Sequence, residues 1–254
     1  MKKLCCIGIL IIDFTPLLAQ PIAFESRPLV PFQAVHIKGG FLVKLVEGAM
    51  PEVKIHSEKL ALEDIITEVN AKGELFVKRK IRPHLSIRYE EEGEDPGIGI
   101  PGRVEVTIVC PPNLKLSEIS RSGGGWLKSE VPLRGDLLRL DNNGSGHIFL
   151  TLVEVQLLEV KLSGSGRVAF QEGQANQQSL SVSGSGRIEA EKLRCFKSKC
   201  SVSGSGQIFL VAEEALEAKV SGTGSIQYEG QPPFLKSSIS GSGKVSALSS
   251  SSAQ

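Results

Sequence analysis

The stretch Ser181–Ala190, SVSGSGRIEA, decides the fold of this 254-residue chain. Its Gly-Ser-Gly centre alone would fit a flexible linker, a phosphate-binding loop or a structural corner. Related stretches recur as NNGSGHIFL, KLSGSGRVAF, SVSGSGQIFL, KVSGTGSIQY and SISGSGKVSA, so that first glycines stand at positions 144, 164, 184, 204, 222 and 241. Their separations are 20, 20, 20, 18 and 19 residues, and a degenerate copy, RSGGGWLKS, places Gly123 about one period upstream. A linker has no reason to keep a period, so the stretch is a repeated structural corner.

Apolar residues recur at fixed positions on both sides of each corner. The two columns before it are Leu140, Val160, Leu180, Cys200 and Ala218, then Leu162, Val182, Val202, Val220 and Ile239. The two columns after it are Ile148, Val168, Ile188, Ile208, Ile226 and Val245, then Leu150, Phe170, Ala190, Leu210, Tyr228 and Ala247. Spacing by two residues predicts strands. Each unit is therefore a strand, a corner, a second strand and a variable return, and the predicted fold is an all-β parallel β-helix or β-solenoid with coils of about 20 residues.

Glycine suits the corners for two reasons: it adopts positive φ, and without a Cβ atom it lets successive corners stack at strand spacing, about 4.8 Å. The predicted structural corner glycines are Gly144, Gly146, Gly164, Gly166, Gly184, Gly186, Gly204, Gly206, Gly222, Gly224, Gly241 and Gly243. The serines between and before them would form stacked hydroxyl ladders and are not expected to act as nucleophiles.

The first 19 residues have the basic, apolar and small-residue order of a secretory signal peptide. Cleavage after Ala19 would leave a single domain over residues 20–247, with irregular, longer coils over 20–118 and regular repeats over 119–247. Residues 248–254 are serine-rich and are expected to be a disordered tail. Within the front half, Leu60–Val69 fits a helix or a strand, and we favour a short turn followed by a strand.

The segment Phe32–Gly48, FQAVHIKGGFLVKLVEG, together with the Gly-Ser-Gly series, resembles the head GIN domain family, described as a "putative auto-transporter adhesin". The resemblance covers roughly residues 30–247. It implies an exported bacterial protein with a parallel β-helix-like fold, right-handed in its coils. The family offers no catalytic residues to transfer to this chain.

Charge and cysteine content limit the partners and cofactors. Removing residues 1–19 leaves 27 basic and 27 acidic residues, which gives no basic surface for nucleic acid. The nine-residue apolar run Leu4–Ile12 is too short to be an uncleaved membrane anchor. No membrane insertion is expected after signal cleavage. Cys195 and Cys200 could form a disulfide, but the repeat places Cys200 in an inward column, which favours a buried thiol. We expect no cofactor.

One outward column is the candidate ligand-facing ladder, formed by His147, Arg167, Arg187 and Gln207. One residue per coil would set these side chains in a row, with Phe149 and Phe209 two positions further along, able to bind sugar or carboxylate. The competing interpretation is an ordinary polar strand face in which Glu189 steadies Arg187. Trp126 could be a sugar-stacking platform or a cap between the irregular and regular parts, and the cap is favoured.

Metal and catalytic sites are not expected. The histidines are scattered without zinc-ligand spacing, and the acidic run Tyr89–Gly97 is typical of a solvated loop. The glutamates of the repeats do not share a column, which disfavours a carbohydrate-active β-helix enzyme. We therefore predict a non-enzymatic, adhesin-like binding module at the cell envelope, either periplasmic, on the outer surface or secreted, with an unknown glycan or envelope protein as partner. The alternative is a structural scaffold that self-associates end to end.

Overall fold

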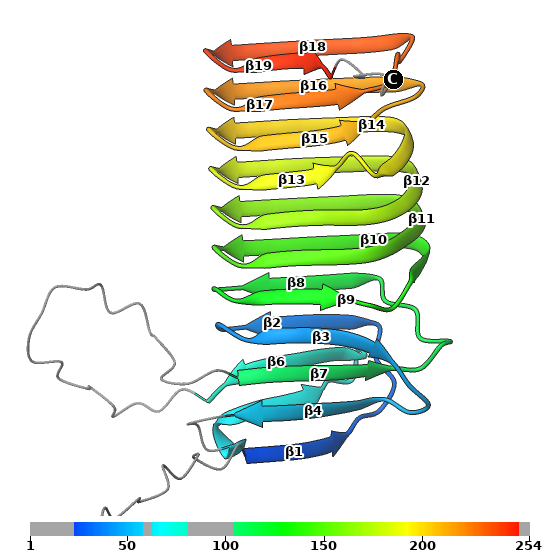
Figure 1. Ribbon diagram of the computed structural model, residues 1–254, viewed down its shortest axis with the longest axis vertical. Coiled ribbons are helices and arrows are strands. Elements are labelled where there is room, and N and C mark those ends of the chain that lie inside the picture. The colour runs from blue at the N-terminus through cyan, green and yellow to red at the C-terminus, as the bar shows by residue number, and fades with distance from the viewer. Residues whose placement is uncertain (1–22, 58–61, 81–103, 249–254) are drawn as a thin grey trace, which may run out of the picture.

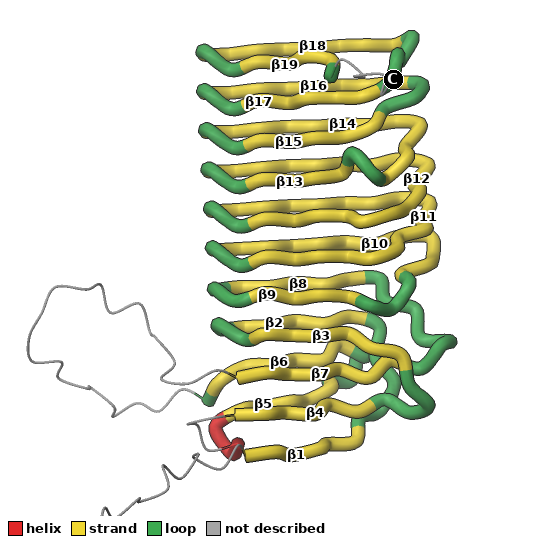
Figure 2. The backbone as a smooth tube through the Cα atoms, in the orientation of Figure 1, coloured by secondary structure: helices red, strands yellow, loops and turns green. Residues whose placement is uncertain are grey.

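The predicted all-β solenoid is confirmed by a computed structural model that describes residues 23–57, 62–80 and 104–248 (Figure 1). The predicted signal peptide, the acidic run Tyr89–Gly97 and the tail after Leu248 lie outside these residues. Coils stack along one axis, and their corners lie in a column along one side of the molecule (Figure 2).

Parallel strands build the regular part, and their bounds follow the repeat. They are β8 (Glu118–Ser122), β9 (Trp126–Ser129), β10 (Leu133–Gly144), β11 (His147–Gly164), β12 (Arg167–Gly184), β13 (Arg187–Ala190), β14 (Leu193–Gly204), β15 (Gln207–Val211), β16 (Ala215–Gly222), β17 (Ser225–Glu229), β18 (Phe234–Gly241) and β19 (Lys244–Ala247). The first corner glycines pair with one another from coil to coil, from Gly144 to Gly241. The repeat therefore sets the strand register.

The corners divide these strands into two facing sheets. The pre-corner sheet contains the strands that lead into the corners: β8, β10, the ends of β11 and β12, β14, β16 and β18. The post-corner sheet contains β9, the starts of β11 and β12, β13, β15, β17 and β19. The apolar columns lie between the two sheets, and nearly all of their residues are less than 5% exposed. The exceptions are in the last two coils, where Ile239 is 47% exposed.

The return segment of the middle coils is more ordered than the repeat predicts. Strands β11 and β12 each run for 18 residues, from one corner to the next. Their middle parts pair with the starts of β10 and β14 and form a short third face. Val153, Ala175 and Leu193 of this face are buried completely. Alternating inward residues therefore make the return a strand as well.

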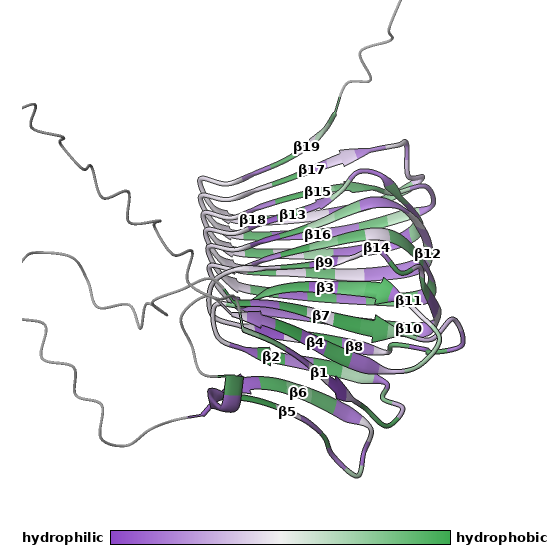
Figure 3. Ribbon diagram, turned by 60° about the horizontal axis from the view of Figure 1, so that its bottom comes forward, coloured by the Kyte–Doolittle hydropathy of each residue, from purple (hydrophilic) through white to green (hydrophobic). Residues whose placement is uncertain are grey.

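The two glycines of each corner satisfy different requirements. The first glycine always has positive φ, from 109° at Gly164 to 118° at Gly144. The second has an ordinary φ, but a Cβ atom there would lie within 3 Å of atoms in the preceding coil; at Gly166 it would be 2.3 Å from the Gly146 carbonyl oxygen. Figure 3 shows the corners as a pale column beside the hydrophobic segments of the strands. The backbones of successive corners can approach closely because the glycines place no side chain between them.

The front half differs from the predicted longer coils. It contains β1 (Ala23–Pro28), β2 (Ala34–Lys38), β3 (Leu42–Glu47), β4 (Glu52–Ser57), the 3-10 helix η1 (Leu62–Asp64), β5 (Ile65–Val69), β6 (Glu74–Arg79) and β7 (Val104–Cys110). Strands β2 and β3 form a coil that stacks directly under β8 and β9, and β6 and β7 lie on its other side. Three further pairs, β1–β4, β4–β7 and β5–β6, are antiparallel. The order of strands in the stack is therefore not their order in the sequence.

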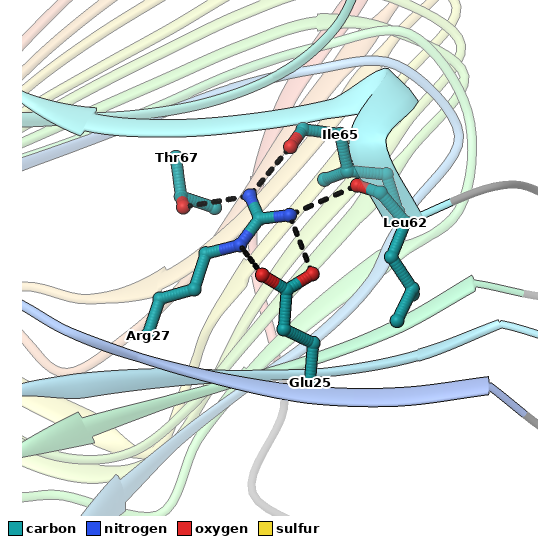
Figure 4. A network of polar contacts seen from close by, with 5 residues as sticks. All are labelled: Glu25, Arg27, Leu62, Ile65 and Thr67. Carbon is teal, nitrogen blue, oxygen red and sulfur yellow. Dashed lines mark hydrogen bonds and ion pairs between the residues drawn. The ribbon is translucent and has the colours of Figure 1, made fainter.

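Arg27 connects β1 with η1 and β5 at the antiparallel end of the stack (Figure 4). Its guanidinium donates to both carboxylate oxygens of Glu25, at 2.8 and 2.9 Å, and to Thr67 Oγ1 at 3.0 Å. It also donates to the carbonyl oxygens of Leu62 at 2.9 Å and Ile65 at 2.5 Å. The bond from Arg27 lowers the pKa of the Glu25 carboxyl. These contacts connect β1 to η1 and β5, the predicted short turn and strand. This end of the stack therefore consists of antiparallel strands.

Candidate functional site

The candidate ladder lies on the outer face of the post-corner sheet. Strand pairing places His147 beside Arg167, Arg167 beside Arg187, and Arg187 beside Gln207. Successive members are one strand spacing apart, about 4.8 Å. Trp126 precedes His147 in the same row and also pairs with Leu42 of β3. Trp126 thus sits where the β2–β3 coil meets the regular repeats, the position expected of a cap.

The two arginines of the ladder are already paired, both with the carboxylate of Glu189. Arg167 Nη2 contacts Glu189 Oε2, and Arg187 Nη1 lies 3.7 Å from Glu189 Oε1. Arg187 Nη2 also donates to Gln207 Oε1 at 2.5 Å. The Glu189 side chain is only 15% exposed, whereas the two arginines are about half exposed. Two cations therefore share one carboxylate, and the group has a single net positive charge.

Two phenylalanines hold the arginines in place. The guanidinium of Arg167 lies 5.9 Å from the ring centroid of Phe149, and that of Arg187 lies 5.3 Å from the ring centroid of Phe209. A guanidinium over an aromatic face is attracted by the ring quadrupole. These contacts join residues of four successive coils, so the array is fixed by the stack rather than by a loop.

A shallow hollow lies beside the ladder, which we call the Ala169 hollow. It has a volume of about 360 Å³ and is lined by Lys128, Phe149, Leu150, Thr151, Ala169, Phe170, Gln171, Glu189, Glu191 and Lys192. Ala169 pairs with Phe149 on one side and with Glu189 on the other. The hollow exists because this row has a methyl group at Ala169 between two larger side chains.

The sequence contains a signal for this hollow in the row of residues next to the ladder. In the row two residues beyond the ladder, successive coils place Lys128, Phe149, Ala169, Glu189, Phe209 and Gln227. Ala169 is the one small side chain among these six. The methyl group of Ala169 between Phe149 and Glu189 marks where the surface is indented.

The cysteines are buried thiols. Cys110, Cys195 and Cys200 are unpaired and at most 1% exposed, which confirms the buried thiol expected at Cys200. Burial raises the pKa of the Cys110 thiol to about 12 and that of Cys195 to about 11. Burial also raises the pKa of Cys200 strongly. None of the three is placed to act as a nucleophile or a metal ligand.

The other sequence candidates lie apart from the hollow. His36 stacks on Phe76 at 4.8 Å, and His56 lies 4.8 Å from the ring of Phe24. Within residues 23–57, 62–80 and 104–248, no three histidine, cysteine, aspartate or glutamate side chains gather to hold a metal ion. A second depression, of about 580 Å³, lies in the front half, and Lys115 is its one ionisable lining residue. The Ala169 hollow therefore has more charged lining residues than the front depression.

The helical content of the described part is limited to the three-residue η1, and no helix there could cross a membrane.

A sequence model of one protein family matches residues 31–232, and it is described as "Putative auto-transporter adhesin, head GIN domain". The chain belongs to this family. The match starts next to the Phe32–Gly48 segment and includes five of the six regular Gly-Ser-Gly corners. The resemblance of those segments to the head GIN domain is thereby confirmed.

Solved structures share the fold of this head GIN domain. A putative adhesin from Bacteroides fragilis is 24% identical, with a TM-score of 0.73 over 90% of this chain and 98% of that chain. A putative adhesin from Parabacteroides distasonis is 19% identical, with a TM-score of 0.65 over 90% and 97%. A putative lipid binding protein from the same organism is 20% identical, with a TM-score of 0.64 over 89% and 96%. No curated protein matches the chain.

Proposed function

We propose that this head GIN domain protein is an exported, non-enzymatic binding module of the adhesin type that acts at the bacterial cell envelope. The family description and the names of two similar structures support an adhesin. The leader-like start, Met1-Lys2-Lys3 followed by Leu4–Ile12, supports export. The single observation that supports the location of the binding surface is the array of Arg167, Arg187, Phe149 and Phe209 on rigid strands.

Rigidity matters because binding costs free energy for every side chain that must become ordered. In this array the arginines are already held between aromatic rings and Glu189, so little freedom remains to be lost. A ligand on this exposed strand face can lie across several coils at once. The proposed partner is a glycan or a protein of the envelope.

A carbohydrate-active enzyme is the competing interpretation, since Glu189 and Glu191 both line the Ala169 hollow. General acid catalysis requires a carboxyl oxygen that can deliver a proton to the glycosidic oxygen. Both oxygens of Glu189 instead face guanidinium groups. This arrangement supports a recognition role for Glu189 and disfavours a catalytic pair.

The test is binding of purified residues 20–254 to a glycan array and to isolated envelope fractions. The variant Arg167→Ala/Arg187→Ala is expected to lose binding. Its matched control is Arg139→Ala/Arg194→Ala, on the pre-corner sheet and the third face, where both arginines are also ion-paired, with Glu159 and Glu213. Loss of binding in both variants, or no binding by the wild type to any fraction, would contradict the proposal. Release of new reducing ends from a bound glycan would favour the enzyme.

End-to-end assembly is a second candidate function, and the last coil favours it. Every residue of β18 is exposed, including Phe234 at 74%, Leu235 at 48% and Ile239 at 47%. Within the described chain, β18 pairs with β16 alone and β19 pairs with β17 alone. Unpaired strand edges are templates for pairing with another chain. At the opposite end β1 and β5 also pair with one strand each, β4 and β6, within the described chain. Three exposed large apolar side chains lie on β18, which favours contact between two C-terminal ends and therefore dimers.

Sedimentation analysis over a hundredfold range of concentration tests this assembly. The expected result is a dimer at high concentration that Ile239→Lys converts to a monomer. A monomeric wild type at every concentration would exclude the scaffold.

A further inference from the structure

We propose that the Ala169 hollow is a subsite for one neutral pyranose ring of an envelope glycan. This inference rests on the proposed binding function and specifies the ligand class. The ladder arginines are already paired with Glu189 and Gln207, so the polar groups left to contact a ligand include Gln171, Glu191 and Lys192 of the hollow.

The size and depth of the hollow suit a single sugar ring. Its volume of about 360 Å³ lies near the lower end of the range for small-molecule sites, roughly 300–1,000 Å³. Ala169 forms the floor, and Phe149 and Glu189 stand on either side along the stack axis. A lipid chain would require a deep apolar channel, whereas this rim carries polar and charged side chains.

The lining offers both faces that a pyranose presents. The ring of Phe149 provides an apolar surface for the C–H face of a sugar. Hydroxyl groups can bond to the carboxylate of Glu191, the amide of Gln171 and the ammonium of Lys192, which together include donors and acceptors. Glu191 and Lys192 are exposed residues of the turn after β13, so they can reach a ligand.

The charge of the lining favours a neutral sugar. Glu189 is already paired with Arg167 and Arg187, so Glu191 and Lys192 remain as one negative and one positive group that can contact a ligand. Lys128 also contacts Glu130 at 3.0 Å. A uronate or sulfated sugar would place its negative charge beside Glu191, and an amino sugar with a free ammonium would face Lys192. Neither sign of charge is favoured, whereas hydroxyl groups bond to both kinds of residue.

The contacts of Arg167 make the hollow rigid. This arginine starts two residues before Ala169, reaches Phe149 in the preceding coil, and contacts Glu189 in the following one. It thereby fixes the two side chains that flank the floor. Loss of Arg167 should therefore weaken sugar binding by loosening the hollow, even though its guanidinium is already paired.

Ala169→Phe is the decisive variant, because it fills the hollow with a side chain that the fold already accepts at this row. Phe149 and Phe209 occupy the same row in other coils. The matched control is Gln227→Phe, which makes the same addition in the same row three coils away from Ala169. Both variants are expected to keep the wild-type melting temperature within a few degrees.

Binding of residues 20–254 to neutral and acidic glycans would be measured on an array and then by titration of the best neutral glycan. We expect Ala169→Phe to weaken this binding at least tenfold and Gln227→Phe to change it less than twofold. If Ala169→Phe fails to fold, Glu191→Ala/Lys192→Ala replaces it, since both residues lie in an exposed turn. Equal binding by wild type and the folded hollow variant would overturn the subsite.

The outcomes also separate this inference from the proposed function. Binding to an envelope protein but to no glycan would leave the binding module intact and exclude the sugar subsite. Preference for acidic glycans, with loss in the Arg167→Ala/Arg187→Ala variant but not in Ala169→Phe, would place the ligand on the ladder instead. Absence of any binding would contradict both.

Discussion

Gly184→Val tests the corner that repeats along the whole stack. Gly184 has a φ of 112°, which a β-branched residue rarely adopts. A Cβ atom there would lie 2.7 Å from the Gly164 carbonyl oxygen, and that atom is backbone, so it cannot rotate away. The same carbonyl accepts a hydrogen bond from the Ser185 amide at 3.0 Å. Valine would therefore strain its own backbone and separate two coils.

The expected cost has two parts. Holding a non-glycine residue in a disfavoured backbone conformation costs about 1–3 kcal/mol, and forcing extra atoms into a packed site costs about 1–3 kcal/mol more. A destabilisation of about 2–6 kcal/mol would lower the melting temperature of a chain of this size by roughly 4–24 °C.

Circular dichroism of residues 20–254 would record the melting temperature, and hydrogen exchange would locate the damage. Because each coil contacts its neighbours alone, faster exchange should centre on the corner ends of β11, β12 and β14. The control is Ser185→Val in the same corner, where the side chain is exposed and a change below about 0.5 kcal/mol is expected. If the two variants melted within 1 °C of each other, the corner argument would be refuted.

Three further predictions follow from burial and charge. Leu162→Ala should cost about 2–5 kcal/mol in denaturant titration, because Leu162 is 1% exposed. Ile239→Ala in the same column should cost less than half as much, because Ile239 is 47% exposed. Equal costs would mean that the last coil is covered. Burial raises the pKa of Cys195 from 9.0 to about 11, so its thiolate fraction at pH 8 should be about 100-fold lower than for a free thiol. A thiol reagent should therefore label none of the three buried cysteines quickly until the chain is unfolded. Rapid labelling of the folded chain would contradict this. Glu213→Gln removes an exposed pair with Arg194 at 2.8 Å and should cost less than about 1 kcal/mol at low salt and nothing measurable in 1 M salt, as compared by thermal melting.

The regular half of the fold could be predicted because its physical causes are local and repeated. A period of 20 residues fixes which glycine stacks on which, and alternation fixes which side chains point inward. Val160, Leu180 and Cys200 are buried for that reason, even though cysteine alone gives no strong signal. The ladder row followed from the same register.

The front half could not be predicted in the same way because it has no repeat. Alternation identifies Glu52–Ile55 as strand but does not say whether its neighbour runs parallel or antiparallel. The structure pairs β4 with β1 and β7, both antiparallel, and inserts the β2–β3 coil beside β8–β9. These are contacts between distant segments, and no local pattern encodes them.

The candidate site was predicted in part. Register predicted the row of His147, Arg167, Arg187 and Gln207, but the columns had to be read across strands to see that Arg167 reaches Glu189, two residues further along and one coil away. The Ala169 hollow depends on the difference between one methyl group and its large neighbours. Such a feature becomes visible when side chains are compared within a row instead of along the chain.

The two outer faces of the solenoid differ in what their charges do. On the pre-corner side and the adjoining third face, Arg134 pairs with Glu154, Arg139 with Glu159, and Arg194 with Glu213, each between neighbouring coils. A slip by one coil would keep glycine stacked on glycine, yet it would place Arg139 opposite Ser179 and Arg134 opposite Gln174. Each exposed pair contributes little to stability, so their joint effect is to favour one register among several with equivalent corners. On the post-corner face the charges converge on Glu189 beside aromatic rings and the Ala169 hollow, and the proposed recognition role rests on this arrangement, in which Arg167 and Glu189 also link neighbouring coils.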